Sequence, residues 1–148
     1  MLPMRAPIIA GNWKMHGGVR EALDLTASIR RQLEGFQGAE VVIFPPFPVL
    51  HQVRAALEGS NLALGAQDVH WEAKGAYTGE VSPTMLKEAG CRFVIIGHSE
   101  RRHIMGETNE MVNRKIRAAL GAGLTPIVCV GELLEERTMG ATREVIER

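Results

Sequence analysis

The sequence predicts an α/β fold built on a parallel sheet, for three reasons. Short apolar runs rich in β-branched residues recur along the chain, amphipathic segments lie between them, and successive runs start about 20 to 35 residues apart, the spacing of consecutive β-α-β units. The 148 residues are enough for one domain with a hydrophobic core. No linker or low-complexity tract divides them.

The predicted strands are five runs of nearly continuous apolar character. Such runs are typical of parallel strands that are buried on both faces. The runs are 8–11, 41–44, 62–65, 93–96 and 126–130.

The predicted helices lie between these strands. Apolar residues recur at helical spacing over 19–33, 49–57 and 111–120. Thr108 is the expected N-cap of the third of these helices, although Lys115 interrupts its apolar stripe. A serine followed by proline at 82–83 predicts one more helix start, because proline fits the first helical turn.

Charge and composition exclude several classes of function. Lysine plus arginine equal aspartate plus glutamate at 17 each, so no net field attracts nucleic acid or an anionic membrane. The start of the chain lacks the apolar core of a secretory signal, and no apolar run approaches the roughly 20 residues that span a bilayer. We therefore expect a cytoplasmic protein in which Cys91 and Cys129 are reduced.

The alternating pattern fits two architectures, an open doubly wound sheet and a closed β/α barrel. A dinucleotide-binding sheet usually carries the motif GxGxxG after its first strand, and residues 11–18 do not contain it. The missing motif argues against a dinucleotide site but leaves other open sheets possible.

Polar residues that could carry chemistry follow two of the predicted strands. Asn12 and Lys14 follow the first, and His98 and Glu100 follow the fourth, so in a barrel all four would meet at the carboxyl-end face. A lone lysine or histidine is more often solvated or structural than functional. Together, however, a cation, an amide and an imidazole suit an anionic substrate with a carbonyl oxygen that gains charge in the transition state.

The sequence resembles the triosephosphate isomerase family in four segments, which occur in family order and at family spacing. They are AGNWKM at 10–15, GAYTGEVS at 75–82, IGHSERR at 96–102 and CVGE at 129–132. The resemblance implies a partial (β/α)8 TIM barrel, of which five parallel strands and their intervening helices are present.

The resemblance also implies a role for each strand-end residue in interconverting dihydroxyacetone phosphate and D-glyceraldehyde 3-phosphate through an enediolate. Lys14 would neutralise the substrate phosphate and the developing oxyanion, and Asn12 would hydrogen-bond the substrate oxygen. His98 would polarise the carbonyl, and Glu100 would tether Lys14 and join proton transfer. This family is itself a well-known example of a neutral catalytic histidine beside a helix N-terminus.

No metal or organic cofactor is expected for this reaction. The histidines support that expectation, because none of them belongs to an HExxH motif or a similarly spaced set of metal ligands. They are His16, His51, His70, His98 and His103.

The segment 67–80 has few apolar residues and reads by itself as a surface loop or a disordered excursion. In the resembling family this loop reaches into a second subunit, which implies a homodimer with Thr78, Tyr77 and Met15 at the interface. Trp71 and Tyr77 suit an interface, although aromatic residues are more often part of a core.

Two further residues match family positions, and we expect structural roles for both. Glu107 is predicted to be a buried carboxylate paired with Arg101, and Cys129 a packed thiol on the fifth strand. No histidine lies near Cys129 in the sequence, so nothing marks it as a nucleophile.

The chain departs from the family in length. A β/α barrel typically has eight strands and roughly 250 residues, whereas residues 1–148 supply five strands and end in an uncapped helical pattern. We expect them to be the N-terminal part of a single TIM-barrel domain without its three C-terminal βα units. The resemblance implies that the missing part holds the glutamate base, the lid and the last phosphate loops.

This departure leaves the chain's own activity open. We expect it to be inactive or nearly so alone, because loss of a general base costs about a hundred- to ten-thousand-fold in rate; Glu100 and Glu132 are not expected to replace the base. The open first and last strands also predict poor folding, self-association or dependence on a complementary fragment. The alternatives are a non-catalytic half-barrel that only folds or assembles, and another phosphosugar-processing barrel.

Overall fold

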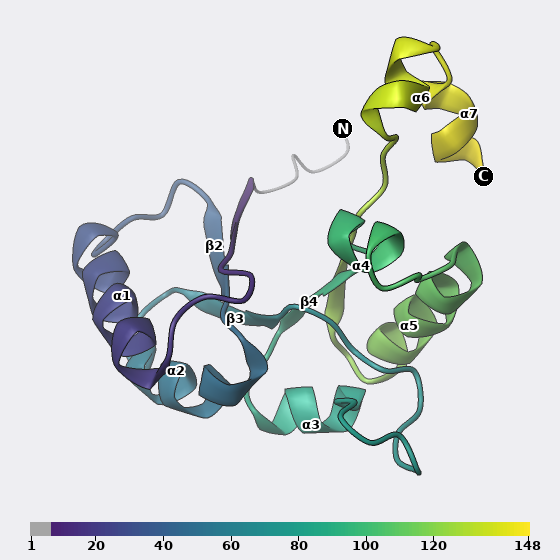
Figure 1. The fold of residues 1–148 in the computed structure, drawn as a ribbon. Helices are drawn as coiled ribbons and strands as arrows, with labels where there is room; N and C mark the ends of the chain where they lie inside the picture. Colours follow the sequence, from purple (N-terminus) through teal and green to yellow (C-terminus); the bar gives the residue numbers. More distant parts are fainter. Residues whose placement is uncertain (1–6) are drawn as a thin grey trace, which may run out of the picture.

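The computed structural model describes residues 7–148, in which five parallel strands form one curled sheet with helices on its outer side (Figure 1). Each strand pairs with the next one in sequence, in the order β1-β2-β3-β4-β5. The elements are β1 (Ile8–Asn12), α1 (Val19–Gln32), β2 (Glu40–Phe44), the 3-10 helix η1 (Phe47–Val49), α2 (Leu50–Ala56), β3 (Ala63–Ala66), α3 (Pro83–Glu88), β4 (Phe93–Ile96), α4 (Ser99–His103), α5 (Asn109–Gly121), β5 (Thr125–Val128), α6 (Leu134–Thr138) and α7 (Thr142–Glu147).

The predicted strands and helices are confirmed, with small shifts at their ends. β4 has the predicted bounds, whereas β5 ends at Val128, two residues before the prediction. The reason is that its neighbour β4 ends at Ile96, which pairs with Val128, so the ladder has no further partner there. The helix predicted over 49–57 is preceded by the 3-10 turn η1, which begins directly after Pro46.

Helix starts follow the predicted caps. The Thr108 hydroxyl accepts a hydrogen bond from the Met111 amide at 3.2 Å, and the Ser82 hydroxyl accepts one from the Met85 amide at the same distance. Each hydroxyl satisfies a backbone N–H that has no partner within the first helical turn. The caps therefore fix where α5 and α3 begin.

The central strands β2, β3 and β4 are buried on both faces, as the continuous apolar runs predict. For the outer strands β1 and β5 that prediction is wrong, because each has a neighbouring strand on one side only and most of its residues are exposed or half-buried. Alternate residues of β2 belong to different clusters: Val41 and Ile43 pack with the helices, and Val42 and Phe44 point to the inside of the curl. The helix-facing cluster is the larger one and contains residues of α1, α2, α3 and α5. The inner cluster consists of Val42, Phe44, Ala63, Phe93 and Ile95, with Ile127 and Cys129 packed against it.

A glycine is required where two inner residues meet. A Cβ atom on Gly65 of β3 would lie 2.2 Å from the ring of Phe44 on β2, far inside van der Waals contact. The Phe44 ring therefore occupies the space that any other residue at position 65 would need. The Phe44 ring thus packs directly over the backbone of Gly65 on the inner face of the sheet.

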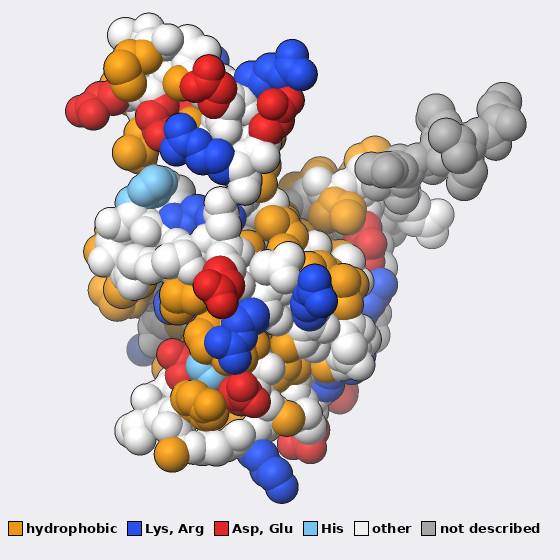
Figure 2. Space-filling model, turned by 90° about the vertical axis from the view of Figure 1, so that its right-hand side faces the viewer, with side chains coloured by type: hydrophobic (Ala, Val, Ile, Leu, Met, Phe, Trp, Pro, Cys, Tyr) orange, Lys and Arg blue, Asp and Glu red, His pale blue; other side chains and the backbone are white. Residues whose placement is uncertain are grey.

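The C-terminal helices stand apart from the sheet. α6 and α7 follow an extended segment after β5 and pack mainly against each other (Figure 1), and from the side they form a lobe above the body of the molecule (Figure 2). Neither helix contains a buried residue. They take no part in either hydrophobic cluster.

Candidate active site

The first part of the candidate site is the turn after β1. Asn12 is the last residue of the strand, and its side-chain oxygen accepts a hydrogen bond of 2.9 Å from the Lys14 amide. Lys14 is the only non-glycine residue with positive φ among residues 7–148, at 56°. Such a conformation costs about 1–2 kcal/mol and is retained where surrounding contacts impose it. The Asn12 side chain is one of those contacts.

Gln67 is a second contact on this turn, and it was not among the residues predicted for the site. Its side-chain amide donates to the carbonyl oxygens of Lys14 and Phe44, at 2.8 Å in each case. Gln67 follows β3 directly, so it shares the strand-end position of the predicted site residues. That position was the signal that could have revealed it.

Lys14 and Glu100 join the ends of β1 and β4. The Lys14 ammonium donates to a Glu100 carboxylate oxygen at 2.6 Å, and both side chains are about half exposed. The hydrogen bond from Lys14 lowers the pKa of Glu100, so this carboxyl is ionised at neutral pH. The structure thus brings together two residues that are 86 positions apart in sequence.

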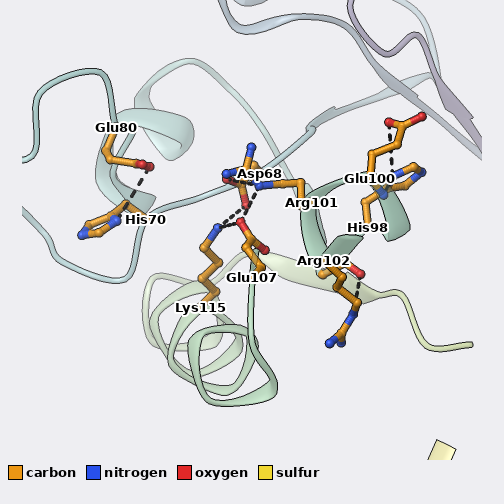
Figure 3. Close-up of polar contacts among 10 residues, drawn as sticks. Asp68, His70, Glu80, His98, Glu100, Arg101, Arg102, Glu107 and Lys115 are labelled. Atoms are coloured by element: carbon orange, nitrogen blue, oxygen red, sulfur yellow. Dashed lines mark hydrogen bonds and ion pairs between the residues drawn. The ribbon is translucent and has the colours of Figure 1, made fainter. Parts of the chain in front are cut away.

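His98 caps the short helix α4. Its Nδ1 atom accepts a hydrogen bond of 3.2 Å from the Glu100 amide, so this nitrogen carries no proton. The ring is therefore neutral and carries its proton on Nε2, and the 3.4 Å approach of Nδ1 to a Glu100 carboxylate oxygen (Figure 3) is not an ion pair. The imidazole offers Nε2–H as a hydrogen-bond donor.

The turn that carries His98 is tied to β5 by Arg102. Gly97 has a φ of 69°, and a Cβ atom there would lie 2.8 Å from the Arg102 guanidinium and 3.0 Å from Val112. Arg102 donates to the carbonyls of Gly97 at 2.8 Å and Cys129 at 3.2 Å. Glycine lets the backbone turn back at the end of β4, and the arginine holds this turn in place.

Four charged residues form a largely buried cluster, in which Arg101 of α4 is half-buried and the other three are buried (Figure 3). The Asp68 carboxylate forms ion pairs with Arg101 Nε at 2.9 Å and with Lys115 Nζ at 2.7 Å. Both cations also form ion pairs with one oxygen of Glu107. Burial raises the pKa of Asp68; burial also raises that of Glu107, but hydrogen bonds from Lys115 and Arg101 outweigh it and leave the pKa below its ordinary value. The predicted pairing of Glu107 with Arg101 is confirmed.

Lys115 does not interrupt the buried face of α5 as the sequence suggested. Its side chain is only 3% exposed because it reaches inward to two carboxylates. Two cations and two anions make the cluster neutral in sum, which is what allows ionised groups to be buried. The apolar pattern missed this because it treats every lysine as a surface residue.

The loop of residues 67–82 is only partly at the surface, which corrects the prediction. Residues 68–70 are buried, and the imidazole of His70 lies between the rings of Trp71 and Tyr77, with centroids 4.3 Å away in each case. The Arg114 guanidinium lies 4.3 Å from the Trp71 ring. Both aromatic rings thus contact His70 within the chain, and Trp71 is half-buried. Tyr77 keeps an exposed side, and Thr78 and Met15 are exposed as well.

The cysteines show no activated thiol. Both are free; burial raises the pKa of Cys91 to about 12, and burial raises that of Cys129 against an opposing effect of Arg102. Cys129 follows the last residue of β5 and packs against the inner cluster. A thiol with a raised pKa is a poor nucleophile.

Within residues 7–148, no group of three or more histidine, cysteine, aspartate or glutamate side chains is placed to hold a metal ion. No helix in that range is long and apolar enough to cross a membrane.

The fold and site together define the class of protein: a partial β/α barrel, with polar side chains at the carboxyl ends of its five parallel strands. A family model described as triosephosphate isomerase matches residues 7–148. The chain belongs to the triosephosphate isomerase family.

Individual relatives agree with this assignment. The chain is 57% identical to triosephosphate isomerase from Thermoanaerobacter pseudethanolicus and 54% identical to that from Carboxydothermus hydrogenoformans, in each case over 97% of this chain and 57% of the relative. A crystal structure of triosephosphate isomerase from Bartonella henselae superposes with a TM-score of 0.92 at 42% identity, covering 97% of this chain and 60% of the other. The chain therefore spans less than two thirds of the length of these relatives.

Proposed function

We propose that Asn12, Lys14, His98 and Glu100 form the substrate-binding and electrophilic side of a triosephosphate isomerase site, which interconverts dihydroxyacetone phosphate and D-glyceraldehyde 3-phosphate. The observation that carries this proposal is the convergence of Lys14, from the end of β1, with Glu100 and His98, from the end of β4. The Lys14 ammonium supplies a positive charge for the phosphate and the developing oxyanion. Glu100 holds that ammonium in place.

The tautomer of His98 suits the step in which the substrate is deprotonated next to its carbonyl. Its free Nε2–H can donate to the carbonyl oxygen as negative charge develops there. The Asn12 amide NH2 group can donate to the same substrate, because only the amide oxygen is used by the Lys14 turn. Two aimed donors and one cation then stabilise an enediolate.

The step also needs a base, and the resemblance assigns it to a glutamate that has no counterpart in these 148 residues. We propose that the chain alone has little or no isomerase activity, and that its strands are five of the eight of one barrel domain. Loss of the base costs about a hundred- to ten-thousand-fold in rate. Without the lid and the last phosphate loops, substrate positioning is weakened as well, while Lys14 and Asn12 keep their contacts to the anion.

Further properties belong to the same proposal. We propose a homodimer in which the exposed Thr78, Tyr77 and Met15 contact the second subunit. We also propose a cytoplasmic location and a place in glycolysis and gluconeogenesis, since both routes pass through triose phosphates. No cofactor is part of the proposed reaction.

Binding of 2-phosphoglycolate, an anionic analogue of the enediolate, tests the site without requiring turnover. Calorimetric titration of the chain should give measurable binding, and Lys14→Met should weaken it at least about tenfold, because a phosphate contact to a charged group is worth about 1.5–3 kcal/mol. The matched control is Lys74→Met, which removes the same charge from an exposed loop position.

The proposal fails if the analogue does not bind, or if Lys74→Met weakens binding as much as Lys14→Met. An isomerase assay belongs beside the titration and should show a rate near background. Turnover that disappears in Glu100→Gln while the fold is retained would contradict the proposed absence of a base.

A further inference from the structure

The helix that carries the candidate site is not fixed by its own packing. α4 has only five residues, and none of them is buried. A helix this short is not stable by itself, so its position depends on contacts with other elements. The contacts of its first turn are therefore what decide where His98 and Glu100 lie.

Two arginines supply these contacts. Arg102 reaches the carbonyls of Gly97 and Cys129, and Arg101 reaches Asp68 at the start of the loop after β3 (Figure 3). Asp68 is almost fully buried, at 5% exposure, so the Arg101 guanidinium is attached to an immobile partner. Arg101 directly follows Glu100, which places this attachment next to the carboxylate that holds Lys14.

The same loop also holds the other side of the site. Gln67, the neighbour of Asp68, donates to the Lys14 carbonyl at 2.8 Å. The contacts thus form a closed ring: Lys14 to Glu100 at 2.6 Å, Arg101 to Asp68 at 2.9 Å, and Gln67 back to Lys14. Residues 67 and 68 thus touch both the lysine turn and the histidine helix.

From this ring we infer that Asp68 is a positioning residue, which holds α4 through Arg101 so that Glu100 and His98 face Lys14. That this geometry serves catalysis rests on the proposed function. The positions of Glu100 and His98 relative to Lys14 are independent of that function. Asp68 touches no reacting atom. It acts through Arg101 on one side and through its chain neighbour Gln67 on the other.

The two carboxylates of the buried cluster differ in a way that makes the inference testable. Asp68 uses each oxygen for a different cation, Oδ1 for Lys115 and Oδ2 for Arg101. Glu107 serves both cations with Oε1, and its buried Oε2 has no hydrogen-bond partner. Asp68→Asn must therefore break one contact, because an amide NH2 group cannot accept from a cation. Glu107→Gln can keep both contacts while removing the same charge.

The experiment compares these two variants by carbon NMR titration of the Glu100 carboxyl in the 148-residue chain, after circular dichroism has shown that the unchanged chain and each variant are folded. This carboxyl reports the Lys14 contact, since the hydrogen bond from Lys14 lowers its pKa. In Asp68→Asn the pKa of Glu100 should rise toward its ordinary value, and in Glu107→Gln it should stay near that of the unchanged chain. Lys14→Met, which removes the donor, sets the full size of the rise.

Arg101→Lys is the second variant, for the case in which Asp68→Asn does not fold. It keeps the cluster neutral but replaces the guanidinium with a shorter-reaching ammonium, so the pKa of Glu100 should rise here too. An unchanged pKa in the folded Asp68 or Arg101 variant overturns the inference. Equal rises in Asp68→Asn and Glu107→Gln also overturn it, because the cause would then be cluster charge rather than position.

The readout separates this inference from the proposed function. No substrate or analogue is present in the titration, so a chain that fails to bind 2-phosphoglycolate can still show the expected difference between Asp68→Asn and Glu107→Gln. Conversely, analogue binding with no such difference would leave the proposed function standing and remove only the role of Asp68.

Discussion

The central strands β2, β3 and β4 and the outer strands β1 and β5 have similarly apolar sequences but different surroundings. All residues of β3 and β4 are buried, and so are four of the five in β2. By contrast, Ile8 and Ile9 of β1 are 48% and 55% exposed, and Val128 of β5 is 39% exposed. An apolar run thus indicates that a strand is suited to burial. Whether the strand is buried depends on its position in the sheet, because only a central strand has a neighbour on each side.

This difference divides the candidate site. His98 and Glu100 follow the central strand β4, and Asn12 and Lys14 follow the outer strand β1. The histidine side is supported by a packed sheet, while the lysine side depends on pairing with β2 and on hydrogen bonds from Gln67 and to Glu100. We therefore expect changes in central strands to damage the fold, and changes around β1 to damage the site first.

The largest expected effect comes from matched isoleucine truncations. Ile96→Ala removes a side chain with no exposed surface from β4 and should lower the free energy of unfolding by about 2–5 kcal/mol, through lost burial and a cavity. Ile9→Ala in β1 should cost less than about 1 kcal/mol. Urea unfolding followed by circular dichroism gives both values. Similar losses of unfolding free energy in Ile96→Ala and Ile9→Ala would mean that β1 is buried in solution. The difference drawn here between central and outer strands would then be wrong.

A smaller effect is expected from the paired glycines. Gly65→Ala places a methyl group against the Phe44 ring and should destabilise the fold by about 1–3 kcal/mol. Gly11→Ala in β1 meets only the Val42 carbonyl, at 3.9 Å, and should be neutral or stabilise by up to about 1 kcal/mol, since alanine restricts the unfolded chain. The thermal midpoint should fall in Gly65→Ala and stay unchanged or rise in Gly11→Ala. A drop for Gly11→Ala as large as that for Gly65→Ala would contradict this.

The smallest effect concerns the polar link between the two regions. Because its pKa is lower in the folded state, ionised Glu100 contributes stability above its unfolded pKa, and this contribution is lost as pH falls through the folded pKa. Lys14→Met removes the cause of the lowering. Urea midpoints measured from pH 7 down to pH 3 should therefore fall slightly more steeply in the unchanged chain than in Lys14→Met.

Lys74→Met is the control for this pH series, because it changes the net charge equally without touching Glu100. Its pH dependence should follow that of the unchanged chain. If Lys74→Met reduces the pH dependence of the urea midpoint as much as Lys14→Met does, the cause is net charge. The Lys14–Glu100 contact between the ends of β1 and β4 would then contribute nothing measurable to stability.

Local patterns were sufficient to predict much of the fold. The bounds of β4, the caps Thr108 and Ser82, and the strand-end positions of Lys14 and His98 all follow from residues within a few positions of each other. The Glu107–Arg101 pair also spans only six positions. The early end of β5 was not predictable in this way, since it depends on where the neighbouring strand stops.

By itself, the sequence determined the order of strands and helices, the family, and which residues stand at the strand ends. Only the tertiary structure decided that Nδ1 of His98 accepts a hydrogen bond, that Lys115 is buried, and that Gln67 and Asp68 connect the two sides of the site. The physical reason is the sequence separation of the interacting residues. Caps and apolar periods are set by near neighbours, whereas the Lys115–Asp68, Gln67–Lys14 and Lys14–Glu100 contacts join residues 47, 53 and 86 positions apart, which meet only because the sheet curls.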